Sequence, residues 1–201
     1  MKQRIIAGID EVGRGPLAGP VIACAIVILP KSDLGIPKSD LGKTGKLKDS
    51  KKLSAKKREK YYRHFLQHQN IQWGIGTVTQ KTIDKINIYE ATRLAMQRAL
   101  YNLSKKALPD FVYIDGIMKI KTTIPQKAVV RGDETIQLCA MASIIAKVTR
   151  DRLMVKYHKK YPYYGFNLHK GYGTRLHLAM LKKHGPCLIH RKSFSPISSL
   201  A

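Results

Sequence analysis

Two adjacent carboxylates near the start of the chain, Asp10 and Glu11, have the clearest capacity for chemistry in this sequence. They close an apolar run that begins at Ile5, and Gly13-Arg14-Gly15 follows them almost at once. Carboxylates at the end of a buried strand suit a hard divalent cation, which takes oxygen ligands. Glycines on both sides of Arg14 let the backbone come close to whatever the arginine contacts. Taken alone, the stretch fits a strand that ends in a solvated polar turn equally well.

Two further aspartates, Asp115 and Asp133, also occur where an apolar strand is expected to end. Ligands of open α/β sheets bind beyond the carboxyl ends of strands, so three neighbouring strands would bring the acids together. Clustered carboxylates repel one another unless a cation neutralises them. The pattern predicts a Mg²⁺ or Mn²⁺ site made of Asp10, Glu11, Asp115 and Asp133. Successive strand residues point to opposite faces, so Asp10 and Glu11 can share this site only if the strand twists or ends between them.

The charge balance points to the class of partner. The 201 residues include 37 lysines and arginines against 13 acids, a formal net charge of +24, which favours a polyanion such as nucleic acid. Three widely spaced cysteines argue against a disulfide framework and a zinc site. The longest apolar run, residues 21–29, is too short to span a bilayer, and the early acids interrupt any signal peptide. We therefore expect a cytoplasmic protein with no membrane partner.

Three basic or aromatic segments are candidates for contacting that partner. Lys51 and Lys52 precede an expected helix start, where they would form either a phosphate clamp or a solvated cationic surface. Tyr172 lies between two glycines directly before another helix, so its ring would either stack on a sugar or base or pack inward. Residues 190–194 combine basic and aromatic types, so Arg191 would either hold phosphate or belong to a staple of the chain terminus.

Hydrophobic periodicity predicts the elements that must position these residues. The expected strands cover residues 4–10, 21–29, 71–79, 111–115 and 126–131. The expected helices cover residues 53–69, with Ser54 as the N-cap, 87–106, 134–161 and 174–183. Residues 31–52, in which Lys-Ser-Asp-Leu-Gly occurs twice, are expected to form a long mobile loop.

The order of these elements predicts an α/β fold. The turn between the first two strands is short, so they should pair antiparallel, and the alternation of strands and helices then predicts a mixed sheet with helices on its faces. We expect one domain over residues 1–201, with roughly 162–201 as a C-terminal helical and basic cap.

These residues and motifs resemble the ribonuclease HII family over nearly the whole chain. The resemblance rests on Gly-Ile-Asp-Glu-Val-Gly-Arg-Gly-Pro at 8–16, Asp-Ser-Lys-Lys-Leu at 49–53, Ile-Asn-Ile at 86–88 with Ala-Thr at 91–92, and Ile-Asp-Gly at 114–116. It continues through Gly-Asp at 132–133, Ala-Ser-Ile-Ile-Ala-Lys-Val-Thr-Arg-Asp at 142–151, His-Lys-Gly-Tyr-Gly-Thr at 169–174 and His-Arg-Lys-Ser-Phe at 190–194. The duplicated loop looks longer than is usual in that family.

The resemblance implies an RNase H-like fold and cleavage of the RNA strand of RNA–DNA hybrids. It also implies incision on the 5′ side of single ribonucleotides embedded in duplex DNA, with 3′-hydroxyl and 5′-phosphate ends. Asp10, Glu11, Asp115 and Asp133 match the family's four acids that bind two Mg²⁺ or Mn²⁺ ions. Gly13-Arg14-Gly15 matches the segment that recognises the ribose 2′-hydroxyl, and Tyr172 matches the tyrosine that stacks on the adjoining sugar.

Two other classes of function compete with this one. A non-catalytic RNA-binding protein would explain the basic charge but not four acids at strand ends. Another RNase H-like nuclease, such as a junction resolvase, would use similar acids on a different substrate. For the enzyme we expect a monomer that holds substrate phosphates with Lys51, Lys52 and the C-terminal basic residues.

Overall fold

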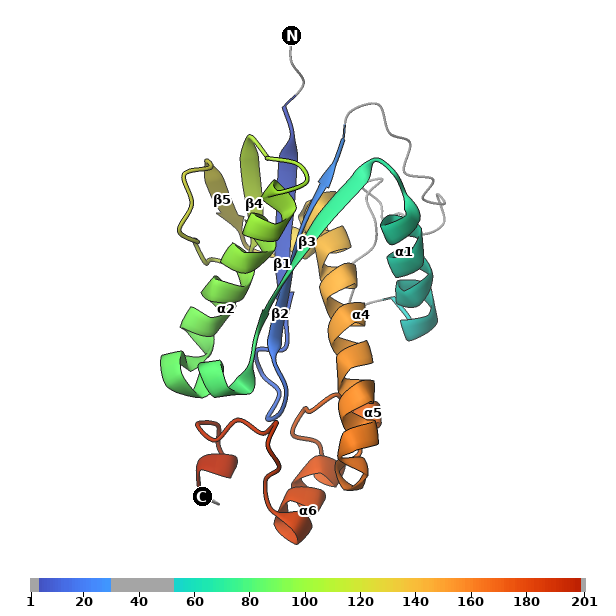
Figure 1. The fold of residues 1–201 in the computed structure, drawn as a ribbon, viewed down its shortest axis with the longest axis vertical. Helices are drawn as coiled ribbons and strands as arrows, with labels where there is room; N and C mark the ends of the chain where they lie inside the picture. The colour runs from blue at the N-terminus through green and yellow to red at the C-terminus, as the bar shows by residue number, and fades with distance from the viewer. Residues whose placement is uncertain (1–3, 30–52, 200–201) are drawn as a thin grey trace.

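A five-stranded mixed sheet forms the centre of the computed structural model, which describes residues 4–29 and 53–199 (Figure 1). The strands are β1 (Ile6–Val12), β2 (Val21–Ile28), β3 (Ile71–Val78), β4 (Phe111–Asp115) and β5 (Gln126–Val129), and their spatial order is β3-β2-β1-β4-β5. β2 runs antiparallel to both β1 and β3, whereas β4 runs parallel to β1 and β5 parallel to β4. The predicted strands, the antiparallel first pair and the mixed sheet are therefore confirmed, although strand ends shift by up to two residues.

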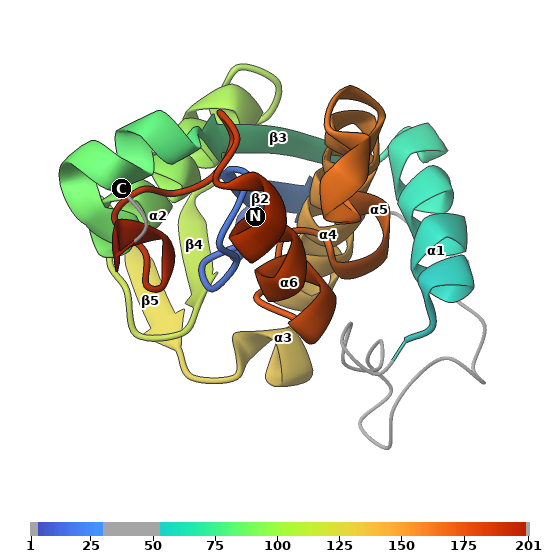
Figure 2. The ribbon, with the colours of Figure 1, turned by 90° about the horizontal axis from the view of Figure 1, so that it is seen from below.

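Helices cover both faces of the sheet, as the sequence predicts (Figures 1 and 2). The longer helices are α1 (Ala55–Gln67), α2 (Gln80–Ser104), α4 (Gln137–Lys160) and α6 (Arg175–His184). The shorter ones are α3 (Gly132–Thr135), α5 (Phe166–His169) and the 3₁₀ turns η3 (Pro162–Tyr164) and η4 (Ile197–Ser199). α2 packs on one face, and α4 packs on the other with α1 beside it. Among the described residues, none of the helices combines the length and apolar character that a membrane span requires.

The helix ends follow local capping chemistry. Ser54 caps α1 as predicted, because its hydroxyl accepts a hydrogen bond from the Lys57 amide. The helix predicted to start at Asn87 in fact begins at Gln80, where Thr79 provides the cap. Asn87 interrupts α2 with a φ of 62°, and its side chain accepts from the Glu90 amide at 3.0 Å. Asn87 therefore caps the second segment of a kinked helix, which is the part that the periodicity predicts.

The single helix predicted over residues 134–161 is wrong in one respect. Ile136 has extended backbone angles and divides it into α3 and α4. The residue before α3, Arg131, adopts left-handed angles, so the chain turns sharply after β5. As a result Asp133 lies in a separate short helix instead of a loop at the strand end.

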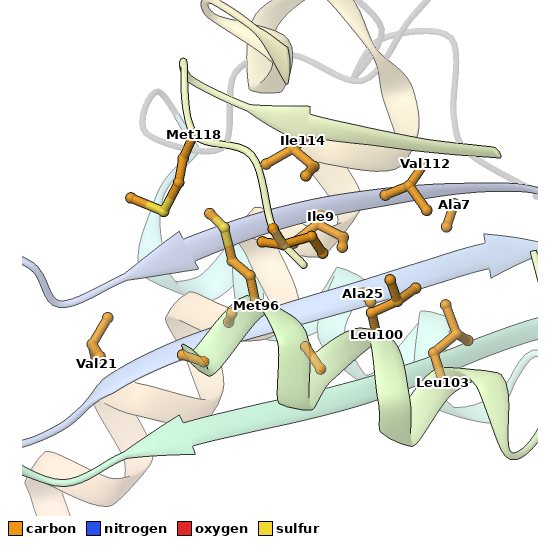
Figure 3. Packing of buried hydrophobic residues seen from close by; sticks show 14 of the residues in the cluster. Ala7, Ile9, Val21, Ala25, Met96, Leu100, Leu103, Val112, Ile114 and Met118 are labelled. Atoms are coloured by element: carbon orange, nitrogen blue, oxygen red, sulfur yellow. The ribbon is translucent and has the colours of Figure 1, made fainter. Parts of the chain in front are cut away.

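Two hydrophobic clusters hold the faces together. On the α2 face, Met96 and Leu100 pack over Ile9 and Ile114 (Figure 3). Close approach is possible because β3 carries glycine there: a Cβ on Gly76 would lie 1.9 Å from the carbonyl oxygen of Ala95. On the opposite face, Cys24 and Ile26 of β2 and Phe65 of α1 pack against Ala142 and Ile145 of α4.

A third cluster joins the β1–β2 connection to the C-terminal part of the chain. Leu17 and Ala18 pack with Phe166, Leu181 and Ile189 beyond the carboxyl end of β1 (Figure 1). Cys24 and Cys139 are buried in the core, as expected. The duplicated segment at 31–42, Lys51 and Lys52 lie outside the described residues.

Candidate active site

Three aspartate side chains meet where β1, β4 and α3 come together. The parallel register pairs Ile9 with Ile114, so the residues that follow them, Asp10 and Asp115, lie side by side on the α4 face. The Asp133 amide at the start of α3 donates to Asp115 Oδ1 at 3.3 Å. Carboxylate oxygens of Asp10, Asp115 and Asp133 all lie within 4.8 Å of one another. The structure thus brings together three of the four predicted acids.

Glu11 occupies a different position. The sequence predicts that the first strand ends at Asp10. In the structure β1 continues to Val12, so Asp10 and Glu11 are consecutive strand residues. Glu11 lines the same pocket as the aspartates but lies outside the group of oxygens within 4.8 Å. Its side chain is 14% exposed and forms an ion pair with Arg14 at 3.5 Å. Glu11 therefore lies at the rim of the cluster, and Arg14 holds it there.

The electrostatics of the cluster favour a cation. Asp10 is 4% exposed, and burial raises its pKa well above the ordinary value, with Glu11 and Asp115 adding to the effect. Hydrogen bonds from the Ser143 hydroxyl and the Glu11 amide act in the opposite direction. Burial also raises the pKa of Glu11, against the attraction of Arg14. An all-oxygen donor set in which ionisation is costly fits a hard divalent ion such as Mg²⁺ or Mn²⁺.

Asp10, Glu11 and Asp115 open into a pocket of about 300 Å³ that also holds other predicted residues. Its lining consists of Asp10, Glu11, Val12, Gly13, Arg14, Gly15, Arg58, Asp115, Ser143, Lys147 and Tyr172. Sequence reasoning missed Arg58, Ser143 and Lys147. A signal for two of them existed, because Ser143 and Lys147 are polar residues one helical turn apart beside the apolar stripe of α4.

Two buried arginines fix the backbone of the Gly13-Arg14-Gly15 segment. Arg150 and Arg191 are each 0% exposed, and in the described part of the chain each guanidinium donates three hydrogen bonds, all to backbone carbonyls. The acceptors of Arg150 are Pro20 at 3.0 Å, Lys170 at 2.9 Å and Ala18 at 3.0 Å. The acceptors of Arg191 are Gly19 at 3.0 Å, Arg14 at 2.7 Å and Gly13 at 2.5 Å.

This placement corrects the prediction that Arg191 contacts substrate. Its guanidinium has no exposed surface, and its donors are committed to the carbonyls of the β1–β2 connection. Arg191 instead fits the other possibility raised by the sequence, because it fastens the C-terminal part of the chain to the β1–β2 connection. Gly13 has a φ of +93°, and a Cβ there would lie 2.3 Å from Arg150 Nε, so the arginines and the glycine form one packed unit.

Tyr172 lies partly exposed across the pocket from Gly15. Its side chain is 41% exposed, and a Cβ added at Gly15 would lie 3.9 Å from its ring. The Tyr172 amide donates to the His169 carbonyl at 3.0 Å, and its own carbonyl contacts His177 Nδ1 at 2.9 Å. The ring therefore faces the pocket while the backbone is held from behind.

A directed chain of hydrogen bonds through two buried histidines supports Tyr172. The Tyr172 carbonyl can only accept, so His177 Nδ1 donates and its Nε2 accepts. His190 Nε2 lies 3.0 Å from His177 Nε2 and must donate, while His190 Nδ1 accepts from the Cys187 amide at 2.8 Å. Burial lowers the pKa of both His177 and His190 to about 4, so both rings are neutral at pH 7. Protonating His177 removes the acceptor of the bond from His190 Nε2, and protonating His190 removes the acceptor of the Cys187 amide.

The histidine chain predicts an acid-labile fold. A histidine with a pKa near 4 when folded and about 6.5 when unfolded binds fewer protons in the folded state, so its contribution to stability is lost as pH falls from about 7 toward 4. The raised pKa of Asp10 makes the folded state more stable as pH falls, which opposes the effect of the histidines. Histidine variants are therefore needed to separate the two contributions. His190→Gln should flatten the dependence of the unfolding free energy on pH, measured in urea, whereas His184→Gln on the surface should not. An NMR titration in which His177 and His190 change charge near pH 6.5 would contradict the chain.

The aspartate cluster predicts a cation-dependent gain in stability. Mn²⁺ or Mg²⁺ should raise the melting temperature of the native sequence, since binding to the folded state alone stabilises it. Asp10→Asn should abolish most of that rise, because it removes a ligand, and should leave the melting temperature in EDTA equal or higher, because it removes repulsion. Asp110→Asn, a change on the exposed surface, serves as the control. An unchanged metal response in Asp10→Asn would exclude Asp10 as a ligand.

Comparison with known proteins agrees with this geometry. The family model described as Ribonuclease HII matches residues 7–197. Ribonuclease HII of a Bacillus cereus strain is 51% identical over 195 residues, which cover 97% of this chain and 70% of the relative. Ribonuclease HII of Bacillus velezensis is 47% identical over 98% of this chain and 71% of the relative. The crystal structure of ribonuclease H2 from Pyrococcus horikoshii superposes with a TM-score of 0.77 at 27% identity, over 98% of this chain and 96% of that one.

Proposed function

The chain belongs to the ribonuclease HII family, whose members are endoribonucleases that cleave the RNA of RNA–DNA hybrids, and we propose that it also incises duplex DNA on the 5′ side of a single embedded ribonucleotide. The products would carry 3′-hydroxyl and 5′-phosphate ends. One observation carries the proposal: Asp10 and Asp115 of the aspartate cluster line a single pocket together with the Gly13–Gly15 segment and Tyr172. That pocket combines groups suited to holding a cation with groups suited to recognising a sugar.

The four acids divide the catalytic work according to their position in the cluster. Asp10, Asp115 and Asp133 would bind the divalent ions, and Glu11 at the rim would complete the set of ligands. When bound, a pair of Mg²⁺ or Mn²⁺ ions supplies Lewis-acid stabilisation to the attacking and leaving oxygens of an in-line displacement. The Ser143 hydroxyl orients the Asp10 carboxylate, and the Asp133 amide orients that of Asp115.

The Gly13-Arg14-Gly15 segment would distinguish ribose from deoxyribose. The 2′-hydroxyl is both a donor and an acceptor, so backbone amides and carbonyls can recognise it where no side chain intervenes. Gly15 supports this role because, among the residues that the structure describes, only the Tyr172 ring lies within 4 Å of a Cβ added there, which leaves the backbone open to the pocket. Arg14 is 50% exposed and would place its charge near a substrate phosphate.

The remaining parts of the proposal concern the surroundings of the site. Tyr172 would stack on the sugar beside the ribonucleotide, and Lys51 and Lys52 would hold phosphates on the basis of their sequence motif. We propose that residues 1–201 act as one catalytic domain, with 162–201 forming its cap, and that the enzyme works as a cytoplasmic monomer.

One assay tests the proposed activity against both competing classes. A DNA duplex with one ribonucleotide is incubated with the protein and Mg²⁺, Mn²⁺ or EDTA, and the products are sized and their ends identified. A metal-dependent cut on the 5′ side of the ribonucleotide is expected. Binding without cleavage would indicate a non-catalytic nucleic-acid-binding protein, and cleavage of an all-DNA four-way junction in preference to this duplex would indicate a resolvase.

Gly15 offers a clean test of ribose recognition, and Gly13 does not. Gly15→Ala should leave the melting temperature unchanged, since within residues 4–29 and 53–199 the added methyl would meet the Tyr172 ring at 3.9 Å and nothing closer, but should slow cleavage at the ribonucleotide by about 100-fold. Gly13→Ala should lose stability as well as activity because its methyl would collide with Arg150. If Gly15→Ala cleaves at the parent's rate, the 2′-hydroxyl is recognised elsewhere.

Tyr172 tests the stacking contact. Replacing the ring should cost about tenfold to 100-fold in kcat/KM, the range expected for one stacked aromatic group. Tyr172→Phe keeps the ring and should retain most of the activity, whereas Tyr172→Ala should not. Steady-state kinetics on the single-ribonucleotide duplex decide the matter, and a greater loss in Tyr172→Phe would indicate that the hydroxyl is the contact.

A further inference from the structure

A basic groove lies between α1 and α4 and adjoins the candidate active site. It has a volume of about 760 Å³, and α1 contributes Arg58 and Tyr62 to its lining. α4 contributes Arg152, Lys156 and Lys159. Arg58 also lines the pocket that holds the aspartates, so the groove and the pocket share a wall. A molecule bound at the aspartates could therefore continue into this groove.

The groove carries a surplus of positive charge. Five cationic side chains line it, namely Arg58, Arg152, Lys156, Lys159 and Lys170, against the two acids Glu59 and Asp151. Both acids are already paired, Glu59 with Arg152 and Asp151 with Lys147 at 2.8 Å. Lys156 and Lys159 are exposed, and within residues 4–29 and 53–199 neither has an ion-pair partner. These two ammonium groups are thus available to a polyanion.

One wall of the groove is held rigid. The guanidinium of Arg152 lies over the ring of Tyr62 at 4.4 Å from its centre, and Glu59 binds the same guanidinium from the side. A cation fixed in this way loses little conformational entropy when it meets a phosphate.

The length of α4 sets the reach of the groove. Lys156 and Lys159 lie 13 and 16 residues after Ser143, which contacts Asp10. At about 1.5 Å per helical residue, the two lysines lie roughly 20 to 24 Å from the aspartates along the helix axis. Phosphates follow one another by about 3.4 Å per strand along a duplex, so the lysines would meet the backbone about six or seven nucleotides from the cut.

We propose that this groove is a second phosphate-binding site that holds one arm of the duplex substrate about six or seven base pairs from the cleaved bond. The proposal rests on the proposed function, because it names the same nucleic acid as the occupant. Its consequence is that the enzyme requires a minimum length of duplex on one side of the ribonucleotide, whereas the chemistry at the aspartates requires none.

The test removes the two free lysines and measures salt dependence. Lys156→Gln/Lys159→Gln should raise KM about threefold to tenfold on a duplex with arms of about 15 base pairs and leave kcat unchanged. The slope of log(kcat/KM) against log[salt] should become shallower by about one to two. Lys105→Gln/Lys121→Gln removes the same charge from exposed positions on the α2 side, where Lys121 lies beside Gln97, and should change KM and the slope by much less.

Shortening the duplex distinguishes the groove from a general charge effect. When one arm is cut to about four base pairs, the native sequence should lose the same factor in KM that the double variant loses, and the variant should lose nothing further. The groove proposal would be overturned if both double variants changed KM equally, or if KM of the native sequence did not depend on the length of either arm. Cleavage at the ribonucleotide would stand in both cases. Absence of any metal-dependent cut by the native sequence would instead overturn the proposed function.

Discussion

The fold holds three carboxylates close together at the candidate active site, and their mutual repulsion must be balanced there. The parallel register of β1 and β4 sets Asp10 beside Asp115, and the left-handed turn at Arg131 starts the short helix in which the Asp133 amide contacts Asp115. Burial already makes ionisation of Asp10 costly, and the neighbouring acids add to that cost. Although the protein has a formal charge of +24, the charged groups that act on Asp10 are the acids Glu11 and Asp115. A divalent cation bound among these carboxylates would relieve the repulsion that remains after the hydrogen bonds from Ser143 and the Glu11 amide.

A second constraint fixes what lies opposite the acids. Arg150 and Arg191 are buried cations whose donors are satisfied by main-chain carbonyls instead of carboxylates. Burial lowers the pKa of Arg150 to about 10 and that of Arg191 to about 9, so both remain charged at pH 7. Removing either would leave several carbonyls without a partner in the interior, a loss of several kcal/mol. The C-terminal tail is therefore part of the scaffold of the Gly13–Gly15 segment, although 172 or more residues separate Arg191 from its acceptors.

The fold could be predicted from the sequence where local patterns decide it. Strand cores, the Ser54 cap and the antiparallel first pair follow from periodicity, capping and turn length. The break at Ile136 could not be predicted, because isoleucine is neither a helix breaker nor a capping residue, and the first segment of α2, residues 80–86, is too short for periodicity to show.

Some features of the candidate site could likewise be predicted from the sequence, and others could not. Acids at strand ends are visible in sequence, since the strand pattern places them. The burial of Arg191 is not visible, because its partners are backbone carbonyls that have no sequence identity. The histidine chain behind Tyr172 is equally hidden, since His190 meets His177 only when the chain after α6 folds back on that helix. Sequence thus indicates which residues bind, whereas the structure shows which residues hold them in place.

Anomalous diffraction from crystals soaked in Mn²⁺ would locate a bound ion at the aspartates independently of activity. The account predicts an anomalous peak about 2.0–2.4 Å from carboxylate oxygens of Asp10, Asp115 and Asp133. A peak bound elsewhere, with these three carboxylates coordinating nothing at saturating Mn²⁺, would contradict it.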